Sequence, residues 1–186
     1  GVGHLGAVLT AQHKYYARQA LAQALPEANP EFSLLPYAFG RTSVPDMDPG
    51  LPYPFFVKPV KAAFSVLARR VNGVEDLQRH LTFHPWETHI IRRLVRPFGD
   101  LMREVTDFDI DPERMMGEGL IDGVQINVDG WMDRGSIGFF GIVDAVMFPG
   151  TTAFQRFEYP SRLPAPARQA AFAVADAGIS LRLSDG

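Results

Sequence analysis

The chain contains no cysteine, so disulfide bonds, thiolate metal sites and a cysteine nucleophile are all excluded. No apolar run approaches the roughly 20 residues that a membrane-spanning helix requires. The first residues have neither the basic start nor the long apolar run of a secretory signal. We therefore expect a cytoplasmic protein that has no membrane partner.

An excess of positive charge is also missing. Eighteen Lys and Arg residues stand against 21 Asp and Glu residues, which gives a formal net charge of −3. A general nucleic-acid binder is usually more basic, so we expect no nucleic-acid partner. Hydrophobic residues form 46% of the 186 residues, which excludes global disorder and indicates about one globular domain.

The charge is unevenly distributed along the chain. Residues 58–103 hold nine basic and four acidic residues, a net of +5, whereas residues 104–133 hold nine acidic residues and one basic residue, a net of −8. A basic segment that opens on a lysine suits a polyanionic ligand such as a triphosphate. Two solvated faces of opposite sign would give the same pattern, and this alternative stays open.

Hydrophobic periodicity and the positions of proline and glycine predict an α+β fold with a proline-rich connection over 26–54. The chain order is helix, strand, helix, strands, helix. The expected helices are 7–25, 74–80, 90–105 and 164–176. The expected strands are 32–35, 55–60, 120–128, 137–148 and the half-buried antiparallel strand 153–159.

Three patterns match known site motifs in part. Residues 1–6 match G-x-G-x-x-G, but no strand precedes them, so a flexible turn into the first helix is favoured over a dinucleotide site. Residues 107–118 mimic a calcium loop, but Pro112 stands where that loop needs glycine. Three histidines have near-ligand spacing without an acidic third ligand, which argues against zinc: His80, His84 and His89.

The strongest chemical signal is Lys58. A lysine inside the apolar strand 55–60 is unfavourable unless its ammonium meets an anion. The next residues, Lys61 to Ser65, are mostly small, so backbone N–H groups and the Ser65 hydroxyl can reach phosphate oxygens. This arrangement predicts a polyphosphate site. The alternative is a lysine on an edge strand that reaches solvent.

On these residues the sequence resembles the ATP-grasp superfamily, in particular its amino-acid ligase and carbamoyl-phosphate-synthase-like branch. The core of the resemblance is Pro54-Phe-Phe-Val-Lys58-Pro-Val, which is similar to the family's P-x-V-x-K-P strand. Further segments resemble other family elements in the same order: the Gly-rich turn 1–6, Lys14 with Arg18, the helix start 71–77, the linking segment 124–130, and the strand and proline motif 141–144 and 157–164.

The resemblance implies two α+β subdomains with a nucleotide held between two antiparallel sheets. Residues 1–54 would be an N-terminal helix and connection, 55–123 the small subdomain, and 124–186 a truncated larger subdomain. The implied function is an ATP-dependent ligase that joins a carboxylate to an amine, or a similar nucleophile, through an acyl phosphate. Its cofactors would be ATP and Mg²⁺, and its substrates a small-molecule carboxylate and amine.

The resemblance also implies site residues. Arg156 and Arg162 would meet a carboxylate or a transferred phosphoryl group, although two solvent-facing arginines would give the same pattern. Asp129 is the candidate for the ribose hydroxyls, because Gln125 and Ile126 stand where the family usually has glutamates. The implied nucleotide-binding residues are Lys14, Lys58, Lys61, Ser65, Gln125, Ile126, Asn127, Val128 and Asp129.

Two departures from the family pattern bear on activity. The segment that covers the phosphates is not Gly-rich, and Lys61 would replace tight backbone contacts with charge. The family's Glu-x-Asn metal motif stands beyond the last helix, and the sequence reaches Gly186 before that motif could appear, so Glu158 is the one weak metal candidate. We therefore interpret the chain as an incomplete ATP-grasp unit that is inactive alone. A non-catalytic nucleotide-binding module, a plain α+β interaction domain and a homo-oligomer all stay open.

Overall fold

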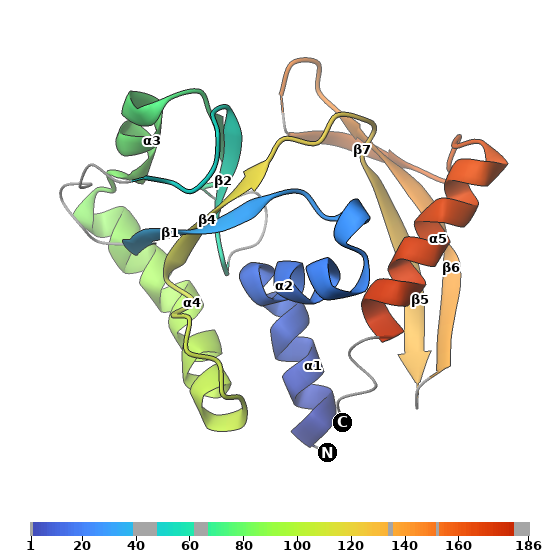
Figure 1. The fold of residues 1–186 in the computed structure, drawn as a ribbon, viewed down its shortest axis with the longest axis horizontal. Coiled ribbons are helices and arrows are strands. Elements are labelled where there is room, and N and C mark those ends of the chain that lie inside the picture. The colour runs from blue at the N-terminus through green and yellow to red at the C-terminus, as the bar shows by residue number, and fades with distance from the viewer. Residues whose placement is uncertain (1, 39–47, 62–66, 134–135, 152, 181–186) are drawn as a thin grey trace. The chain divides into compact units, whose positions relative to one another are not determined.

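The computed structural model describes residues 2–38, 48–61, 67–133, 136–151 and 153–180. The described residues form five α-helices and seven strands, which confirms the α+β class (Figure 1). The chain divides into two compact units. Unit 1 comprises residues 1–19 and 29–120, and unit 2 comprises residues 20–28 and 121–186. The division at 120/121 lies three residues before the boundary expected from the sequence.

Unit 1 is built on a four-stranded antiparallel sheet of order β1-β4-β2-β3 (Figure 1). The strands are β1 (Phe32–Ala38), β2 (Phe55–Pro59), β3 (Arg69–Val71) and β4 (Arg114–Gly119). β2 therefore lies between two other strands. Alternate residues of β2 enter a core that the helices α3 (Val74–Leu81) and α4 (Pro85–Val105) complete. That core contains Leu35, Phe55, Val57, Val71, Leu77, Leu81, Ile91, Val95 and Met115.

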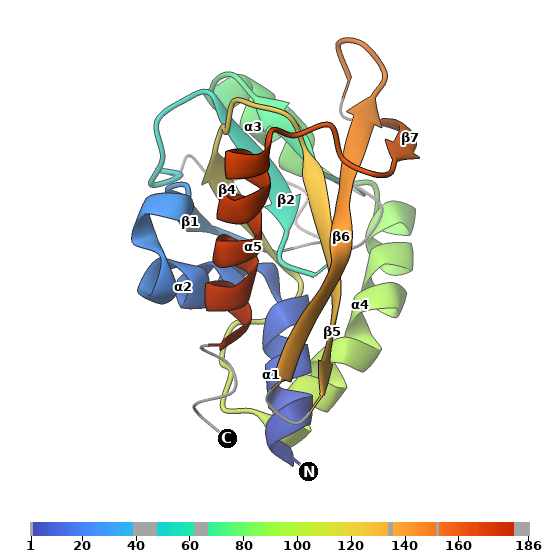
Figure 2. The ribbon, with the colours of Figure 1, turned by 90° about the vertical axis from the view of Figure 1, so that its right-hand side faces the viewer.

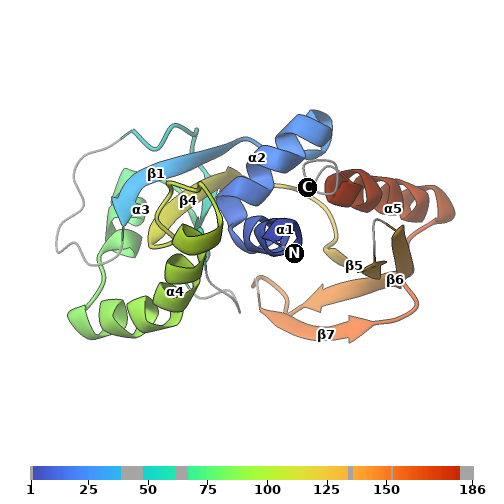
Figure 3. The same ribbon diagram turned by 90° about the horizontal axis from the view of Figure 1, so that it is seen from below.

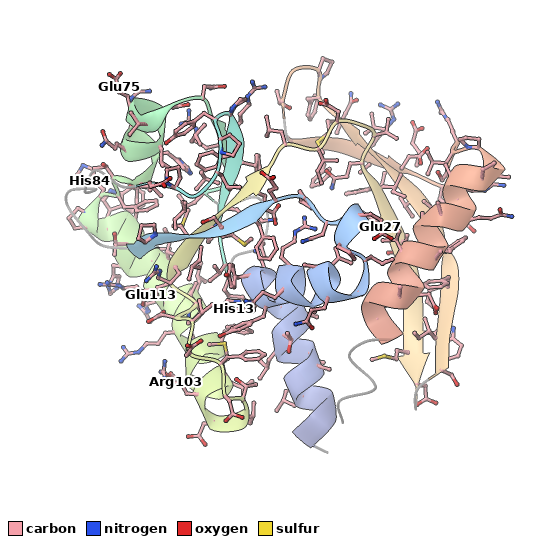
Figure 4. All side chains as sticks on the ribbon, in the orientation of Figure 1. His13, Glu27, Glu75, His84, Arg103 and Glu113 are labelled. Atoms are coloured by element: carbon pink, nitrogen blue, oxygen red, sulfur yellow. The ribbon has the colours of Figure 1, made fainter. Side chains whose placement is uncertain are left out.

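The N-terminal segment differs from the single helix that the sequence predicts. It forms α1 (Val2–Gln12) and α2 (Lys14–Ala24), with His13 at the junction, as Figure 4 shows. The break is held by tertiary contact, because the Lys14 N–H donates to the Val60 carbonyl at 2.9 Å. Gly3 and Gly6 lie inside α1, so the expected Gly-rich turn is wrong for these residues.

The helix α4 begins earlier than predicted. Pro85 occupies its first turn, and the His84 N–H donates to the Glu87 carboxylate at 2.8 Å, so the start is capped. One face of α4 is buried through Thr88, Ile91, Val95, Gly99 and Met102. Of the described helices, none combines the length and the apolar character that crossing a bilayer requires.

Unit 2 contains a three-stranded antiparallel sheet of order β5-β6-β7. The strands are β5 (Ile126–Asp133), β6 (Ser136–Met147) and β7 (Phe154–Glu158), so the predicted strand 137–148 is confirmed. The helix α5 (Ala165–Ser180) lies against β5 and β6 (Figures 2 and 3), and Phe172 contacts Phe139 with ring centroids 5.1 Å apart. β7 is mainly exposed rather than half-buried as predicted.

Candidate functional site

The side chain of Lys58 points away from the core face of the unit 1 sheet. Phe55, Val57 and Pro59 are buried on one face of β2, and the alternation places Phe56 and Lys58 on the other. The Lys58 side chain is only 17% exposed. The interpretation of Lys58 as an edge-strand lysine that reaches solvent is therefore wrong, since β2 is flanked by β3 and β4.

The anion that meets Lys58 in the structure is Glu118 of β4. Phe56 pairs with Glu118 and Lys58 with Met116 across the two strands, so Lys58 and Glu118 are diagonal neighbours on one face. The Lys58 Nζ lies 2.6 Å from the Glu118 Oε2. The Glu118 side chain is 8% exposed. This carboxylate is thus a buried partner that fixes the position of the Lys58 ammonium.

A second cation reaches the same carboxylate from α2. The Arg18 Nε donates to Glu118 Oε1 at 2.7 Å, and an Arg18 terminal nitrogen donates to Glu118 Oε2 at 3.3 Å. Asn29 accepts a further bond from Arg18 at 3.3 Å. Two-point contact of this kind is the strong form of an arginine–carboxylate pair. Glu118 therefore ties the helix α2 to the middle of the sheet.

The remaining lysines lie in the same region. Lys14 occupies the first turn of α2, one helical turn before Arg18, and Lys61 follows β2. The Lys61 Nζ donates to the Gln12 side chain at 2.6 Å and lies 4.4 Å from the centre of the Phe98 ring. Lys14, Lys58 and Lys61 are the three lysines of the whole chain. We call these three lysines, with Arg18 and Glu118, the cation cluster.

The pKa values of the cluster show that its charges interact. The pKa of Lys14 is lowered to about 8, first by burial and then by the positive charges of Lys58 and Lys61, against the opposing charge of Glu118. Burial also lowers the pKa of Lys58, and Glu118 opposes that effect. For Glu118, burial raises the pKa, but the bonds and charges of Arg18 and Lys58 outweigh it, so the pKa lies below its ordinary value.

Such a cluster can stabilise an anion. Arg18 and Lys58 contact one buried carboxylate, and Lys14 interacts with its charge; burial first, and then repulsion among the cations, lowers the pKa values of Lys14 and Lys58. A ligand with several negative oxygens would relieve that repulsion and would favour the charged form of each lysine. Ser65, the predicted hydroxyl donor after Lys61, lies outside the described residues.

The predicted unit 2 residues occupy β5 and the turn before it. The Gln125 carbonyl accepts a bond from the Ala145 N–H at 2.9 Å. Ile126, Asn127, Val128 and Asp129 pair with Asp144, Val143, Ile142 and Gly141 of β6. β5 is an outer strand of this sheet in the part of the chain that the structure describes. The backbone groups of alternate residues in β5 therefore point away from β6, where they can contact a ligand.

The two predicted arginines of unit 2 converge on one carboxylate. The Arg156 Nε lies 2.6 Å from Glu158 Oε1, and an Arg162 nitrogen lies 2.9 Å from Glu158 Oε2. Asp144 fixes the turn that carries Arg162, since it accepts bonds from the Ser161 hydroxyl and, at 2.9 Å, from the Arg162 N–H. Those bonds, the backbone one first, lower the pKa of Asp144.

The described residues do not form a Mg²⁺ site. Both oxygens of Glu158, the weak metal candidate, face arginines. Among the described residues, no group of three or more His, Asp or Glu side chains could hold a metal ion. The calcium-like segment is a loop over residues 107–113, in which Asp109 accepts a bond from the Tyr16 hydroxyl at 2.8 Å, and its remaining residues belong to β4. The His80 ring contacts the Leu67 carbonyl at 2.9 Å instead of a metal.

Glu118, the central anion of the cluster, was not predicted from the sequence. Its signal was present, because an acidic residue follows the apolar pair Met115-Met116 in a segment that turned out to be the buried strand β4. A carboxylate within a buried strand is rare unless it is paired. The three contributing positions are 18, 58 and 118, and nothing local in the sequence links them.

No family model matches the sequence, and no curated protein matches it. Solved structures do match the fold. An L-amino acid ligase from Bacillus licheniformis superposes with a TM-score of 0.61 at 18% identity, covering 95% of this chain and 34% of that one. A carboxyaminoimidazole ribonucleotide synthase from Aspergillus clavatus, complexed with ATP, gives 0.62 at 16% identity, covering 94% and 39%. A biotin carboxylase from Campylobacter jejuni gives 0.58 at 19% identity, covering 92% and 34%.

These neighbours are ATP-grasp ligases, so the expected ATP-grasp fold is confirmed. The identities are too low to carry more than the fold. The chain spans about a third to two fifths of the length of these three neighbours.

Proposed function

We propose that this chain, which has the ATP-grasp fold, is the nucleotide-binding part of an ATP-dependent ligase. The observation that carries the proposal is the cation cluster, in which Lys58 contacts Glu118, and Lys14 interacts with the charges of Lys58, Lys61 and Glu118. The triphosphate of ATP supplies several negative oxygens in a row, which is the ligand chemistry that such a cluster favours. One of the structural neighbours was solved with ATP.

Each member of the cluster has a role in this proposal. Lys58 and Lys14 bind phosphate oxygens, and Lys61 adds charge at the end of β2. Glu118 and Arg18 are positioning residues, because they hold the Lys58 ammonium in place. In the free protein, burial and the neighbouring positive charges disfavour the charged form of Lys14 and Lys58. The negative charge of bound ATP would favour that charged form again.

The proposed reaction follows the acyl-phosphate route. A carboxylate oxygen of the substrate attacks the γ-phosphorus, and the bond to the bridging oxygen breaks, releasing ADP. An amine nitrogen then attacks the acyl carbon, and inorganic phosphate leaves. The lysines lower the barrier by positioning the phosphates and by cancelling charge on their oxygens. No step is assigned to Mg²⁺, because the described residues do not form a site for it.

Unit 2 contributes the other predicted contacts. We assign the adenine to the backbone groups of residues 125–128 and the ribose to Asp129. We assign the substrate carboxylate or the transferred phosphoryl group to Arg156 and Arg162. The carboxylate of Glu158 supports this assignment in one respect, because it holds both guanidinium groups together.

Replacing Lys58 by alanine tests the assignment directly. We expect the affinity for a non-hydrolysable ATP analogue to fall by about 1–3 kcal/mol, roughly 5- to 150-fold, because a charge-assisted contact is lost. Isothermal titration calorimetry measures this change. The control is Arg92→Ala, which removes a cation from an exposed pair with Glu113 and should leave the affinity unchanged. Equal affinities of the wild type and the Lys58→Ala variant would remove Lys58 from the site.

The pKa of Lys14 gives the binding a pH dependence. Because the free protein holds Lys14 at a pKa of about 8, we expect the affinity for the analogue to decrease as the pH rises through 8. Bound phosphate should raise the Lys14 pKa, since it favours the charged ammonium. NMR of ¹³C-methylated lysines can follow this titration, because the chain has three lysines. A Lys14→Arg variant should bind without the loss above pH 8, and an unchanged pH profile in that variant would contradict the assignment.

A second candidate function is a non-catalytic nucleotide-binding module, and one observation favours it: both oxygens of Glu158, the weak metal candidate, are held by arginines. Such a module would bind the ATP analogue but would form no ADP when ATP, Mg²⁺, carboxylates and amines are supplied. A plain α+β interaction domain would bind no analogue at all. Calorimetry and an ADP assay together separate the three functions.

A further inference from the structure

The helix α4 carries a second apolar face that the fold of unit 1 does not use. Its core face is buried, yet four large apolar side chains on another face are exposed to solvent: Leu94 is 72% exposed, Trp86 62%, Ile90 49% and Leu101 41%. Pro97 is exposed between them. We call these five residues the α4 stripe.

The spacing of the stripe shows that it is one continuous surface. Its residues follow one another at intervals of three or four, which places them along one side of an α-helix. From Trp86 to Leu101 the stripe extends about 22 Å at 1.5 Å per residue. Apolar residues that are exposed singly are common, but a contiguous exposed patch of this kind usually marks an interaction site.

The charges beside the stripe point to its partner. Arg93 and Asp100 are two helical turns apart, so they border the stripe on the same side and have opposite signs. Leu94 and Leu101 are also two turns apart, within the stripe. The midpoint between Arg93 and Asp100 and the midpoint between Leu94 and Leu101 both fall beside Pro97. A two-fold axis near Pro97 would therefore bring Leu94 against Leu101 of a second α4, and Arg93 against Asp100 of that helix.

We propose that the α4 stripe binds the α4 stripe of a second copy of this chain, with the two helices antiparallel. An isologous contact requires one patch to be complementary to itself, and the stripe meets this requirement in both its leucines and its flanking charges. Pro97, at the centre of the stripe, has no backbone N–H, but two helices associate through their side chains, so no bond between the helices is lost. Asp100 also pairs with Arg103 within its own helix (Figure 4 labels Arg103), and Arg93 of the second copy can share that carboxylate.

This partner fits the chemistry of the stripe better than a membrane surface or an unlike protein. Arg93 and Arg96 are exposed on α4 together with Asp100 and Glu104, so the polar border carries both signs, whereas the rim that anionic lipids attract is basic.

Sedimentation velocity of the 186-residue chain, across a range of concentrations, tests the proposal. We expect a reversible monomer–dimer equilibrium in the wild type. Leu94→Glu should abolish the dimer without unfolding the chain, because the Leu94 side chain is largely exposed. A wild type that stays monomeric at every concentration overturns the proposal, and so does a dimer that persists unchanged in the Leu94→Glu variant.

A charge swap tests the antiparallel register itself. Arg93→Asp and Asp100→Arg should each raise the dissociation constant about tenfold, because each places like charges across the two-fold axis. The double variant Arg93→Asp, Asp100→Arg should restore the wild-type constant, since both pairs are then remade with exchanged signs. If the double variant is as weak as the single ones, the register is wrong. Binding to anionic vesicles by a monomeric wild type would instead assign the stripe to lipid.

Discussion

Replacing Glu118 by alanine is expected to lower the free energy of unfolding by about 3–5 kcal/mol. The carboxylate is 8% exposed and contacts both Lys58 and Arg18, so its removal leaves two largely buried cations facing each other without an anion. Loss of one member of a buried charge pair is more damaging than loss of the pair, because the remaining charge stays desolvated. Chemical denaturation monitored by circular dichroism at neutral pH measures the change.

Two further variants separate this explanation from a general effect of removing glutamate. Glu113→Ala removes the carboxylate of an exposed pair with Arg92, and we expect it to change stability by less than about 1 kcal/mol. Glu118→Gln keeps the shape and hydrogen-bonding capacity but removes the charge. Its loss in free energy of unfolding should therefore lie between that of Glu118→Ala and that of Glu113→Ala. If Glu118→Ala is as mild as Glu113→Ala, the cation cluster does not depend on Glu118.

The buried imidazole of His13 should make unit 1 sensitive to acid. Burial lowers the pKa of His13 to about 4 from 6.5, and the side chain is 0% exposed. Below pH 6.5 the unfolded chain binds a proton at His13 that the folded chain does not bind. The contribution of His13 is therefore fully present above pH 6.5 and is lost as the pH falls to about 4, a loss of roughly 3 kcal/mol.

The pH dependence of a non-titrating variant checks this prediction. His13→Gln retains a polar side chain of similar length but takes up no proton, so its free energy of unfolding should fall less steeply between pH 6.5 and 4 than that of the wild type. His13→Leu should show the same shallow slope, even if its stability at pH 7 differs. Parallel slopes in the wild type and both variants would show that another group accounts for the acid sensitivity.

Some elements were predictable because their signals are local. The strand at Phe55–Pro59 and the long strand at Ser136–Met147 are apolar runs bounded by proline, glycine or serine, and α5 begins directly after Pro164 with a second proline in its first turn. The strand β4 was not predicted, because glycine and glutamate weaken its β-propensity. Its pairing with β1 and β2 on both sides makes it a strand.

The cation cluster was predictable only in part. A lysine within an apolar strand indicated an anion near Lys58, and the family resemblance added Lys14 and Lys61. The identity of the internal anion was not accessible, because Arg18, Lys58 and Glu118 come from three separate segments that only the sheet register brings together. The break between α1 and α2 at His13 was not predictable from the local sequence either, because the hydrogen bond from the Lys14 N–H to the distant Val60 carbonyl fixes the start of α2.

The sequence by itself determined the α+β class, the main strands and the presence of an unusual lysine in a buried strand. These properties depend on residues close together in the chain, whose burial and periodicity are fixed locally. The tertiary structure alone decided which carboxylate pairs with that lysine, how the other lysines join it, and that α4 exposes a second apolar face. Each of these depends on contacts between distant residues, and strand pairing and helix packing set those contacts when the chain folds.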